Sequence, residues 1–248
     1  MSNLIIYGKN PIIELLSNPS SEIEELYISR NDKSNEASEI LKTAKSRGIR
    51  TSSLTKESLS ELCDTHSHQG IAARIKDYEY HNLADIVSRT KEKGDKLLLI
   101  ILDHLEDPQN LGAIIRTADV LGAHGVVIPK DRAASVTPAV VKASSGAVSY
   151  MPVSRVVNLA NVIRDLKKGG VWIVGADSSS STSVHQEDFK NLDIALVIGN
   201  EGKGLGNNIK SECDFLVSIP QSGKVSSLNA SVAAGILVYE IIRQRTSN

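Results

Sequence analysis

The chain has 248 residues, of which 41% are hydrophobic and 23% are charged, with a formal net charge of −1 and two cysteines. This composition predicts an ordinary soluble protein of one large or two modest domains, and the near-zero net charge excludes a chain that is basic throughout, so any basic footprint must be local. The longest aliphatic run, 97–102, is too short to cross a bilayer, the first residues lack the apolar core of a signal peptide, and Cys63 and Cys213 form no metal-binding pattern, so we expect a cytoplasmic protein.

Residues 4–77 alternate short helical and extended patterns and predict a small α/β domain. Asn10-Pro11 is a cap followed by a first-turn proline, which indicates a helix through about Leu16. The later elements are expected in the order strand 25–29, helix 35–47, strand 49–53, helix 55–63 and strand 70–75. We assign a first domain to residues 1–77.

The next stretch, 78–95, has the composition of a linker, with at most a short helix at 83–89. From residue 96 to 248 the chain reads as a run of βα units that forms a second domain. Its purely apolar strands favour a parallel sheet with both faces covered. The expected strands are 97–103, 125–128, 150–153, 171–175, 194–199 and 215–220, and the expected helices are 111–121, 138–145, 158–167 and 227–244.

Two of these strands run directly into loops that carry polar side chains. The strands 194–199 and 215–220 break at Gly199 and Pro220. In open α/β sheets ligands bind at the carboxyl ends of the strands, so the two loops predict a cofactor pocket. The polar residues that the loops bring to it are Glu201, Ser226, Ser227 and Asn229.

The glycine-rich segment 199–206 does not have the spacing of a nucleotide-binding loop. A P-loop requires Gly-x4-Gly-Lys-Ser/Thr, and the dinucleotide fingerprint requires Gly-x-Gly-x-x-Gly at the start of a helix. Neither fits Gly-Asn-Glu-Gly-Lys-Gly-Leu-Gly. The plainer alternative is a tight turn that needs positive φ, in which Glu201 is a solvated loop charge.

Two further segments combine polar residues with helix starts. In 107–118 Asn110 lies at an expected helix cap with Arg116 about two turns further on, and in 226–229 two serines and an asparagine precede the last helix. Capping alone would explain both segments. His66 and His68 form a possible metal pair, but no third ligand is evident nearby and we expect a loop instead. The serine run 178–181 is expected to be a surface loop without a functional role.

These segments together resemble the SpoU (TrmH) family of RNA ribose 2'-O-methyltransferases, within the SPOUT group. The resemblance rests on three motifs in the family's order: Asn-Leu-Gly-Ala-Ile-Ile-Arg-Thr-Ala at 110–118, Ile-Gly-Asn-Glu-Gly-Lys-Gly-Leu at 198–205, and the segment 219–233 with Ser-Leu-Asn-Ala-Ser-Val-Ala. Near the start, Tyr-Gly-Lys-Asn-Pro-Ile at 7–12 and His-Gln-Gly-Ile-Ala-Ala at 68–73 resemble the substrate-binding domain of the bacterial 23S rRNA guanosine 2'-O-methyltransferase subgroup. Asn10 departs from that subgroup, which more often has histidine there.

The resemblance implies the fold, the cofactor and the assembly. The first domain would have an L30e/L7Ae-like fold that binds rRNA, and the second would be a SPOUT domain with a deep trefoil knot near its C-terminus that binds S-adenosylmethionine. It also implies a homodimer that uses neither a metal nor a membrane.

The same resemblance implies the site residues. The active site would comprise Asn110, Arg116, Glu201, Ser227 and Asn229. Backbone groups of Gly199, Ile219 and Leu228 would hold the adenosine part of the cofactor. The implied reaction is methyl transfer to the ribose 2'-hydroxyl of a guanosine in 23S rRNA.

A guanidinium stays protonated in proteins, so Arg116 is expected to clamp the phosphate beside the target ribose and not to act as the base. The proton would go to that phosphate or to Glu201, with Asn110 and Asn229 orienting Arg116 and the ribose. Three alternatives stay open: a tRNA guanosine 2'-O-methyltransferase, an antibiotic-resistance type of rRNA methyltransferase, and a non-catalytic RNA-binding protein of ribosome assembly.

Overall fold

The computed structural model describes residues 4–17, 23–30, 32, 34–75, 78–223 and 227–246. Its internal contacts divide the chain into two compact units. The first comprises residues 1–79 together with 136–150, and the second comprises residues 80–135 and 151–248.

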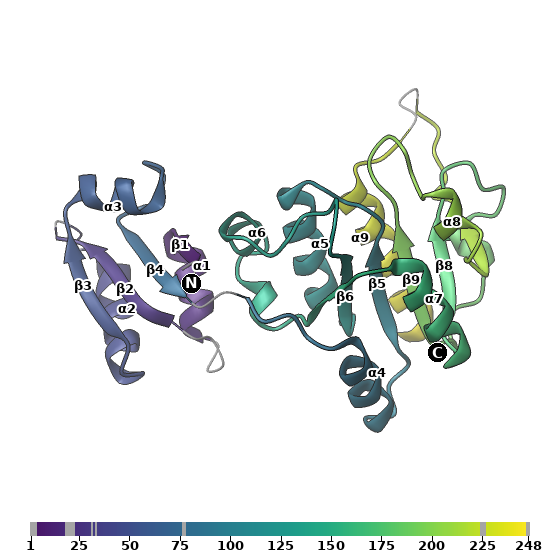
Figure 1. The fold of residues 1–248 in the computed structure, drawn as a ribbon, viewed down its shortest axis with the longest axis horizontal. Helices are drawn as coiled ribbons and strands as arrows, with labels where there is room; N and C mark the ends of the chain where they lie inside the picture. Colours follow the sequence, from purple (N-terminus) through teal and green to yellow (C-terminus); the bar gives the residue numbers. More distant parts are fainter. Residues whose placement is uncertain are drawn as a thin grey trace. The chain divides into compact units, whose positions relative to one another are not determined.

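The first unit is built on a four-stranded mixed sheet in the order β1-β4-β2-β3 (Figure 1). The pairs β1–β4 and β4–β2 are antiparallel, whereas β2 and β3 are parallel. Leu59, on a helix, packs in a core cluster with Tyr27 and Ala72 of the sheet. The elements are β1 (Leu4–Tyr7), α1 (Lys9–Ser17), β2 (Ile23–Ser29), α2 (Asn35–Ser46), β3 (Arg50–Leu54), α3 (Lys56–Cys63) and β4 (Ile71–Ile75), with α6 (Pro138–Ala143) and the 3-10 turn η1 (Ala147–Ser149).

The helix starts of this unit follow from local capping. Ser34 and Thr55 have extended backbones, and their hydroxyl groups accept hydrogen bonds from the backbone N–H groups of Ala37 and Ser58. Such caps satisfy donors that the first turn leaves without partners. The strand β1, which pairs with β4, was not expected from the sequence because four apolar residues before a helix carry no alternating pattern.

The second unit is built on a six-stranded sheet in the order β10-β8-β9-β5-β6-β7, and every pair in it is parallel. The strands are β5 (Leu98–Leu102), β6 (Gly125–Pro129), β7 (Val153–Val156), β8 (Trp172–Ala176), β9 (Ile194–Ile198) and β10 (Phe215–Val217). Every residue of β5, β6 and β9 is buried, and those of β5 and β9 are at most 2% exposed. The apolar runs therefore form the parallel, doubly covered sheet that the sequence predicts.

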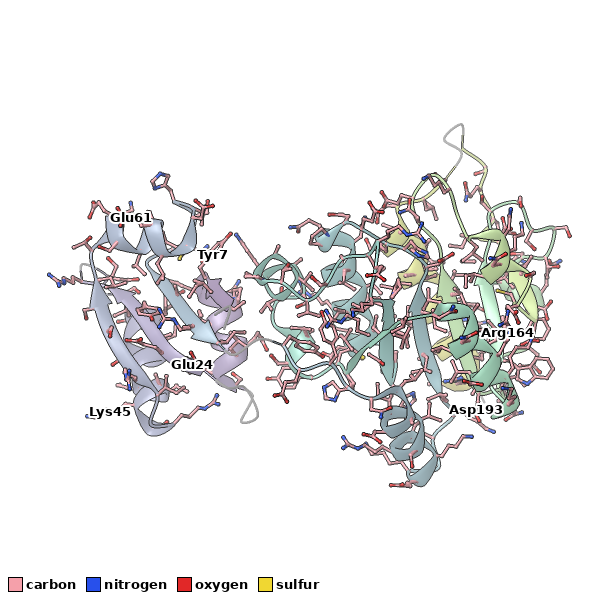
Figure 2. All side chains as sticks on the ribbon, viewed as in Figure 1. Tyr7, Glu24, Lys45, Glu61, Arg164 and Asp193 are labelled. Carbon is pink, nitrogen blue, oxygen red and sulfur yellow. The ribbon has the colours of Figure 1, made fainter. Side chains whose placement is uncertain are left out.

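Helices cover both faces of this sheet. Side chains of α4, α7 and α8 share a core cluster with alternate residues of β5 and β9, and α5 packs against α9. The helices are α4 (Leu83–Glu92), α5 (Pro108–Val120), α7 (Leu159–Lys168), α8 (Asn207–Lys210) and α9 (Ala230–Thr246), with the 3-10 turn η2 (Val184–Gln186). The starts of β5 and β9 are aligned by Asp193, labelled in Figure 2, whose Oδ1 accepts the N–H of Leu97 at 2.8 Å.

Several element boundaries differ from the expected ones. The expected strand 150–153 is placed too early in the sequence. The strand β7 begins at Val153, because Tyr150 ends the 3-10 turn and Pro152 has no N–H group to donate to a neighbouring strand. The last helix begins at Ala230 and not at 227. The expected linker 78–95 carries the helix α4, and its Ile86 is 6% exposed and packs into the core of the second unit.

Candidate active site

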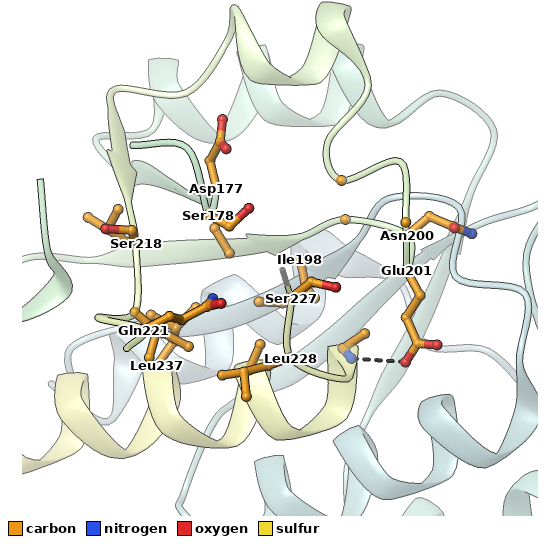
Figure 3. Close-up of a pocket in the computed structure, with 18 residues that line it drawn as sticks. Asp177, Ser178, Ile198, Asn200, Glu201, Ser218, Gln221, Ser227, Leu228 and Leu237 are labelled. Carbon is orange, nitrogen blue, oxygen red and sulfur yellow. Dashed lines mark hydrogen bonds between the residues drawn. The ribbon is translucent and has the colours of Figure 1, made fainter. Parts of the chain in front are cut away.

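A cavity of about 300 Å³ opens at the carboxyl ends of β8, β9 and β10 (Figure 3). The loops that follow these three strands form its walls together with the first turns of α9. The expected cofactor residues Gly199, Ile219 and Leu228 all line it, as do Glu201 and Ser227. Ser226 lies outside the described residues.

The loop after β9 approaches its own backbone so closely that residue 199 has no room for a side chain. A Cβ at Gly199 would overlap the carbonyl group of Gly204 at a separation well below 3.0 Å. Asn200 and Gly204 exchange two backbone hydrogen bonds, of 3.1 and 2.9 Å. The left-handed backbone, with φ of +87° at Gly202 and +65° at Gly204, explains these two glycines. The glycines therefore fold the loop back on itself and set the position of Glu201.

Three of the expected site residues form one hydrogen-bonded cluster. The Oε1 atom of Glu201 accepts hydrogen bonds from the Nδ2 atoms of Asn110, at 3.0 Å, and Asn229. Asn229 Nδ2 also donates to Asn110 Oδ1 at 2.9 Å. These residues come from three separate segments of the chain, and the structure brings their side-chain ends together.

The cluster sits at the amino end of α9. Glu201 Oε1 accepts the backbone N–H of Ala230 at 3.0 Å, a contact drawn in Figure 3. Asn229 caps the same helix, because its Oδ1 accepts from the backbone N–H groups of Ser231 and Val232. A carboxylate at the amino end of a helix is stabilised by the helix dipole and by otherwise unpaired N–H groups. Glu201 and Asn229 thus both cap α9 and form the cluster.

Asn110 is held in place by the start of α5. Asp107 is the N-cap of that helix, and its carboxylate accepts the backbone N–H groups of Gln109 and Asn110, while Pro108 occupies the first turn. Asn110 itself is 6% exposed. The expected cap residue was Asn110, whereas the structure gives that role to Asp107 and leaves the Asn110 amide for Glu201 and Asn229.

Arg116 lies on the same helix as Asn110 but is exposed. Six residues at about 100° each place the two side chains roughly 120° apart around the helix. Arg116 is not among the residues that line the cavity. The place of Arg116 in the site therefore stays a prediction.

The cavity also has lining residues that the sequence did not single out: Asp177, Ser178, Asn200, Ser218 and Gln221. Ser178 belongs to the serine run that was expected to have no functional role. The only sequence signal for Asp177 and Ser178 is their position directly after the apolar strand β8, where ligands of parallel sheets bind. Asp177 forms an ion pair with Lys210, and this hydrogen-bonded partner lowers the pKa of the carboxyl below its usual range.

The described lining of the cavity is acidic and apolar. Among the described residues that line the cavity there are two carboxylates, Asp177 and Glu201, and no lysine or arginine. Apolar side chains such as Ile198, Val217 and Leu237 provide the rest of the wall. Such a cavity can enclose a partly apolar, cationic molecule, which agrees with the exclusion of a nucleotide-triphosphate loop.

His66 and His68 serve the structure of their loop. Both rings contact the Ser60 hydroxyl at 3.1 Å, and His68 Nδ1 accepts the backbone N–H of Gly70 at 3.0 Å. Burial lowers the pKa of His68. Within the described part of the chain, no three His, Cys, Asp or Glu side chains are grouped so that they could hold a metal ion.

In the part of the chain that the structure describes, every helix is too short or too polar to span a membrane.

A cavity among loops at the carboxyl edge of a parallel sheet is typical of α/β enzymes that bind a small cofactor, and comparisons with known proteins give the family. Residues 97–239 match the SpoU rRNA Methylase family, and residues 5–81 match a family described as RNA 2'-O ribose methyltransferase substrate binding. The chain belongs to the SpoU/TrmH family of RNA 2'-O-ribose methyltransferases.

The relatives are similar over nearly the whole chain. YacO of Bacillus subtilis, named for the TrmH family of tRNA/rRNA methyltransferases, is 45% identical over 97% of this chain and 95% of its own length. The crystal structure of the SpoU methyltransferase AviRb from Streptomyces viridochromogenes, in complex with AdoMet, superposes with a TM-score of 0.82 at 30% identity and covers 99% of this chain and 92% of that one. An AdoMet-bound rRNA methyltransferase from Sinorhizobium meliloti gives 0.81 at 26% identity, with 99% and 88% covered.

Proposed function

We propose that this chain transfers a methyl group from S-adenosylmethionine to the ribose 2'-hydroxyl of a guanosine in 23S rRNA. The observation that carries the proposal is the Asn110–Glu201–Asn229 cluster at the rim of a cavity with no basic lining among its described residues. The AdoMet-bound structures of AviRb and of the Sinorhizobium protein support this cofactor.

The cavity residues fit S-adenosylmethionine, which supplies an electrophilic methyl group when bound. Backbone groups of Gly199, Ile219 and Leu228 would hold the adenosine part, since these residues line the cavity and Gly199 allows close approach. The apolar wall excludes water from that end. Ser227 lies at the rim and would contact the ribose or the methionine part of the cofactor.

The ribose 2'-hydroxyl must lose a proton as it attacks, so the site must orient the hydroxyl and accept the proton. Asn110, Asn229 and the N–H of Ala230 hold Glu201 through Oε1, and these bonds do not involve Oε2. Oε2 of Glu201 or the neighbouring RNA phosphate would accept the proton. Arg116, exposed on α5, would clamp that phosphate and fix the ribose in line.

The extent of the similarity favours rRNA over tRNA as the substrate. The match to the rRNA methyltransferase from Sinorhizobium meliloti spans 99% of the chain. By contrast, the match to a protein of 2-OH methylation of C/U34 on tRNA covers 60% of the chain, and the match to the A. aeolicus TrmH/SpoU tRNA modifying enzyme covers 65%. We assign residues 1–77 to an rRNA-binding domain of L30e type, 78–95 to the linker and 96–248 to the methyltransferase domain, with α9 completing a deep trefoil knot.

We also propose a homodimer that packs through α9. Val232, Ile236 and Tyr239 follow one another at spacings of four and three, so they share one face of the helix, and they are 49%, 39% and 57% exposed. Val120, on the packed neighbour α5, is 74% exposed. An apolar stripe of this kind on a soluble protein marks an interaction surface.

The decisive experiment maps ribose methylation on 23S rRNA and tRNA from cells with and without the protein. The proposal expects loss of one 2'-O-methylguanosine from 23S rRNA, restored by the purified protein and S-adenosylmethionine. Loss of a tRNA methyl group instead would make the chain a tRNA enzyme. An unchanged map of both RNAs would contradict methyl transfer to either.

A further inference from the structure

The second unit contains another cavity, of about 470 Å³, that the proposed cofactor site does not use. It lies at the same edge of the sheet, among the loops that follow β5, β6 and β7 and the start of α8. Its volume falls within the range typical of small-ligand sites, about 300 to 1,000 Å³. The loop 199–206 separates it from the cofactor cavity, since residues 199–202 and 204 line one and residues 206–209 line the other.

The floor of this second cavity is a buried carboxylate with both oxygens engaged. Asp103 is 2% exposed, and it accepts hydrogen bonds from His104 Nδ1 at 2.6 Å and from the backbone N–H of Gly206 at 2.7 Å. A Cβ at Gly206 would lie 3.2 Å from Asp103 Oδ2. The floor is therefore fixed, and its carboxylate is committed to protein donors.

Two side chains of the cavity are held on strained backbone. Of the described residues in the second unit, His104 and Arg132 are the two non-glycine residues with left-handed backbone, at φ of 55° and 52°. Such a conformation is unfavourable for residues that carry a side chain. Both residues line this one cavity, and strain of this kind clusters at functional sites.

The lining combines planar, apolar and amide groups. His104 and Arg132 carry planar groups that stack on unpaired bases, and Val157, which is 81% exposed, adds an apolar surface at the rim. The amides of Asn207 and Asn208 can donate to and accept from the edge of a base. Arg132 is adjacent to the exposed Asp131, so the lining does not concentrate positive charge and does not suit a cluster of phosphates.

A hydrogen bond joins this cavity to the cofactor site. Asn200 lines the cofactor cavity, and its Nδ2 donates to the backbone carbonyl of His104 at 2.8 Å. Figure 3 shows the Asn200 side chain extending away from Ser178. A ligand in contact with His104 would thus touch a residue that is hydrogen-bonded to Asn200, which directly precedes Glu201 in the loop.

We propose that this second cavity binds one unstacked nucleotide of the substrate RNA, with its base against His104, Arg132 and Val157 and its edge read by the amides of Asn207 and Asn208. The inference rests on the proposed function, because it takes RNA as the substrate. It adds a base-binding subsite that is separate from the cofactor cavity and from the Asn110–Glu201–Asn229 cluster.

Alkylation of introduced thiols tests the subsite directly. Val157→Cys places a thiol at the rim, and Lys130→Cys places one on a neighbouring exposed residue that does not line the cavity. Guanosine 5'-monophosphate or a single-stranded rRNA fragment at saturation should slow alkylation in Val157→Cys by about fivefold and leave Lys130→Cys unchanged. Peptide mass spectrometry separates these thiols from Cys63 and Cys213. Equal alkylation of Val157→Cys with and without both ligands would overturn the inference.

A second variant checks the contribution of stacking. Arg132→Gly removes the guanidinium while glycine accepts the left-handed backbone, and Lys130→Ala is the matched control. Loss of one base-stacking partner should raise KM for RNA by about tenfold with kcat changed little, and S-adenosylmethionine affinity should stay at the wild-type value. The same KM in both variants would contradict the subsite. The alkylation result with guanosine 5'-monophosphate decides the inference even if no RNA is methylated, so the two proposals can fail separately.

Discussion

At the scale of single residues, the site depends on one carboxylate oxygen that receives donors from three directions. Glu201 Oε1 is shared by Asn110, Asn229 and the first turn of α9. The motifs identify these residues through their resemblance to the family. Their contacts with one another could not be predicted from spacing, because 91 residues separate Asn110 from Glu201 in the chain. Asp177 could not be predicted either, since an aspartate after a strand is common.

Arg116 gives the first prediction. Arg116→Ala should lower kcat/KM for RNA by about 100- to 1,000-fold, because it removes a charged clamp on the phosphate next to the reacting ribose. Arg116→Lys keeps the charge and loses the bidentate fork, so it should recover only part of the rate. Methyl transfer is measured with radiolabelled cofactor, and calorimetry should show unchanged S-adenosylmethionine binding in both variants. Normal turnover in Arg116→Ala would remove this residue from the mechanism.

Gly199 gives the second prediction. Gly199→Ala forces a methyl group into the backbone of Gly204, and overpacking of this kind costs about 1–3 kcal/mol. We expect S-adenosylmethionine affinity to fall at least about tenfold, as measured by calorimetry. Gly223→Ala is the control, since a Cβ there meets no atom of the described residues within 4 Å. Equal affinities in the two variants would show that the turn can relax without affecting the cavity.

At the scale of elements, the apolar pattern of the sequence was sufficient to predict the buried strands but not the short or exposed elements. The run at 97–102 predicts β5 within one residue. The helix α4 was assigned to a linker because only Ile86 and Thr90 of its ten residues are buried, so its sequence is polar on most of its surface. The four-residue α8 is too short to produce a periodic signal.

The last helix gives a prediction about pH. Glu240 accepts hydrogen bonds from Arg243 and Gln244, and the bond with Arg243 is the main reason that its pKa falls to about 2. A carboxyl whose folded pKa is depressed stabilises the fold above its unfolded pKa, near 4.5, and loses that contribution as pH falls toward 2. The free energy of unfolding of Glu240→Gln should therefore be lower than wild type at pH 6, with the difference shrinking below pH 4.5. Denaturant titrations at pH 6, 4 and 3 measure it, and a constant difference would contradict the assignment.

The exposed face of α9 gives a prediction about assembly. Ile236→Asp puts a charge in the middle of the apolar stripe, which should convert a dimer to a monomer in light scattering at micromolar concentration. Ile13→Asp, at a residue of similar exposure on α1, is the control and should leave the mass unchanged. A monomeric wild-type protein, or a dimer that survives Ile236→Asp, would rule out α9 as the interface.

At the scale of the whole molecule, the two units are expected to divide binding and chemistry between them. Deleting residues 1–76 should abolish methylation of rRNA fragments and leave S-adenosylmethionine binding close to wild type. The segment 136–150 belongs to the first unit, so the truncated protein must first be shown to fold by cofactor binding and thermal melting. Full activity of such a protein would assign RNA recognition to the second unit alone.

The convergence of distant segments on Glu201 also constrains how the protein folds during its synthesis. Asn110 and Asn229 are 119 residues apart, and their contact closes only when the whole run of strands between them has been ordered. Native contacts with such separations form slowly, because loop-closure entropy is lost before the contact is gained. During synthesis the ribosome must deliver all of those residues before the cluster can assemble. Cofactor binding would thus report on complete folding of the second unit, and a partly made chain would be unable to act on RNA.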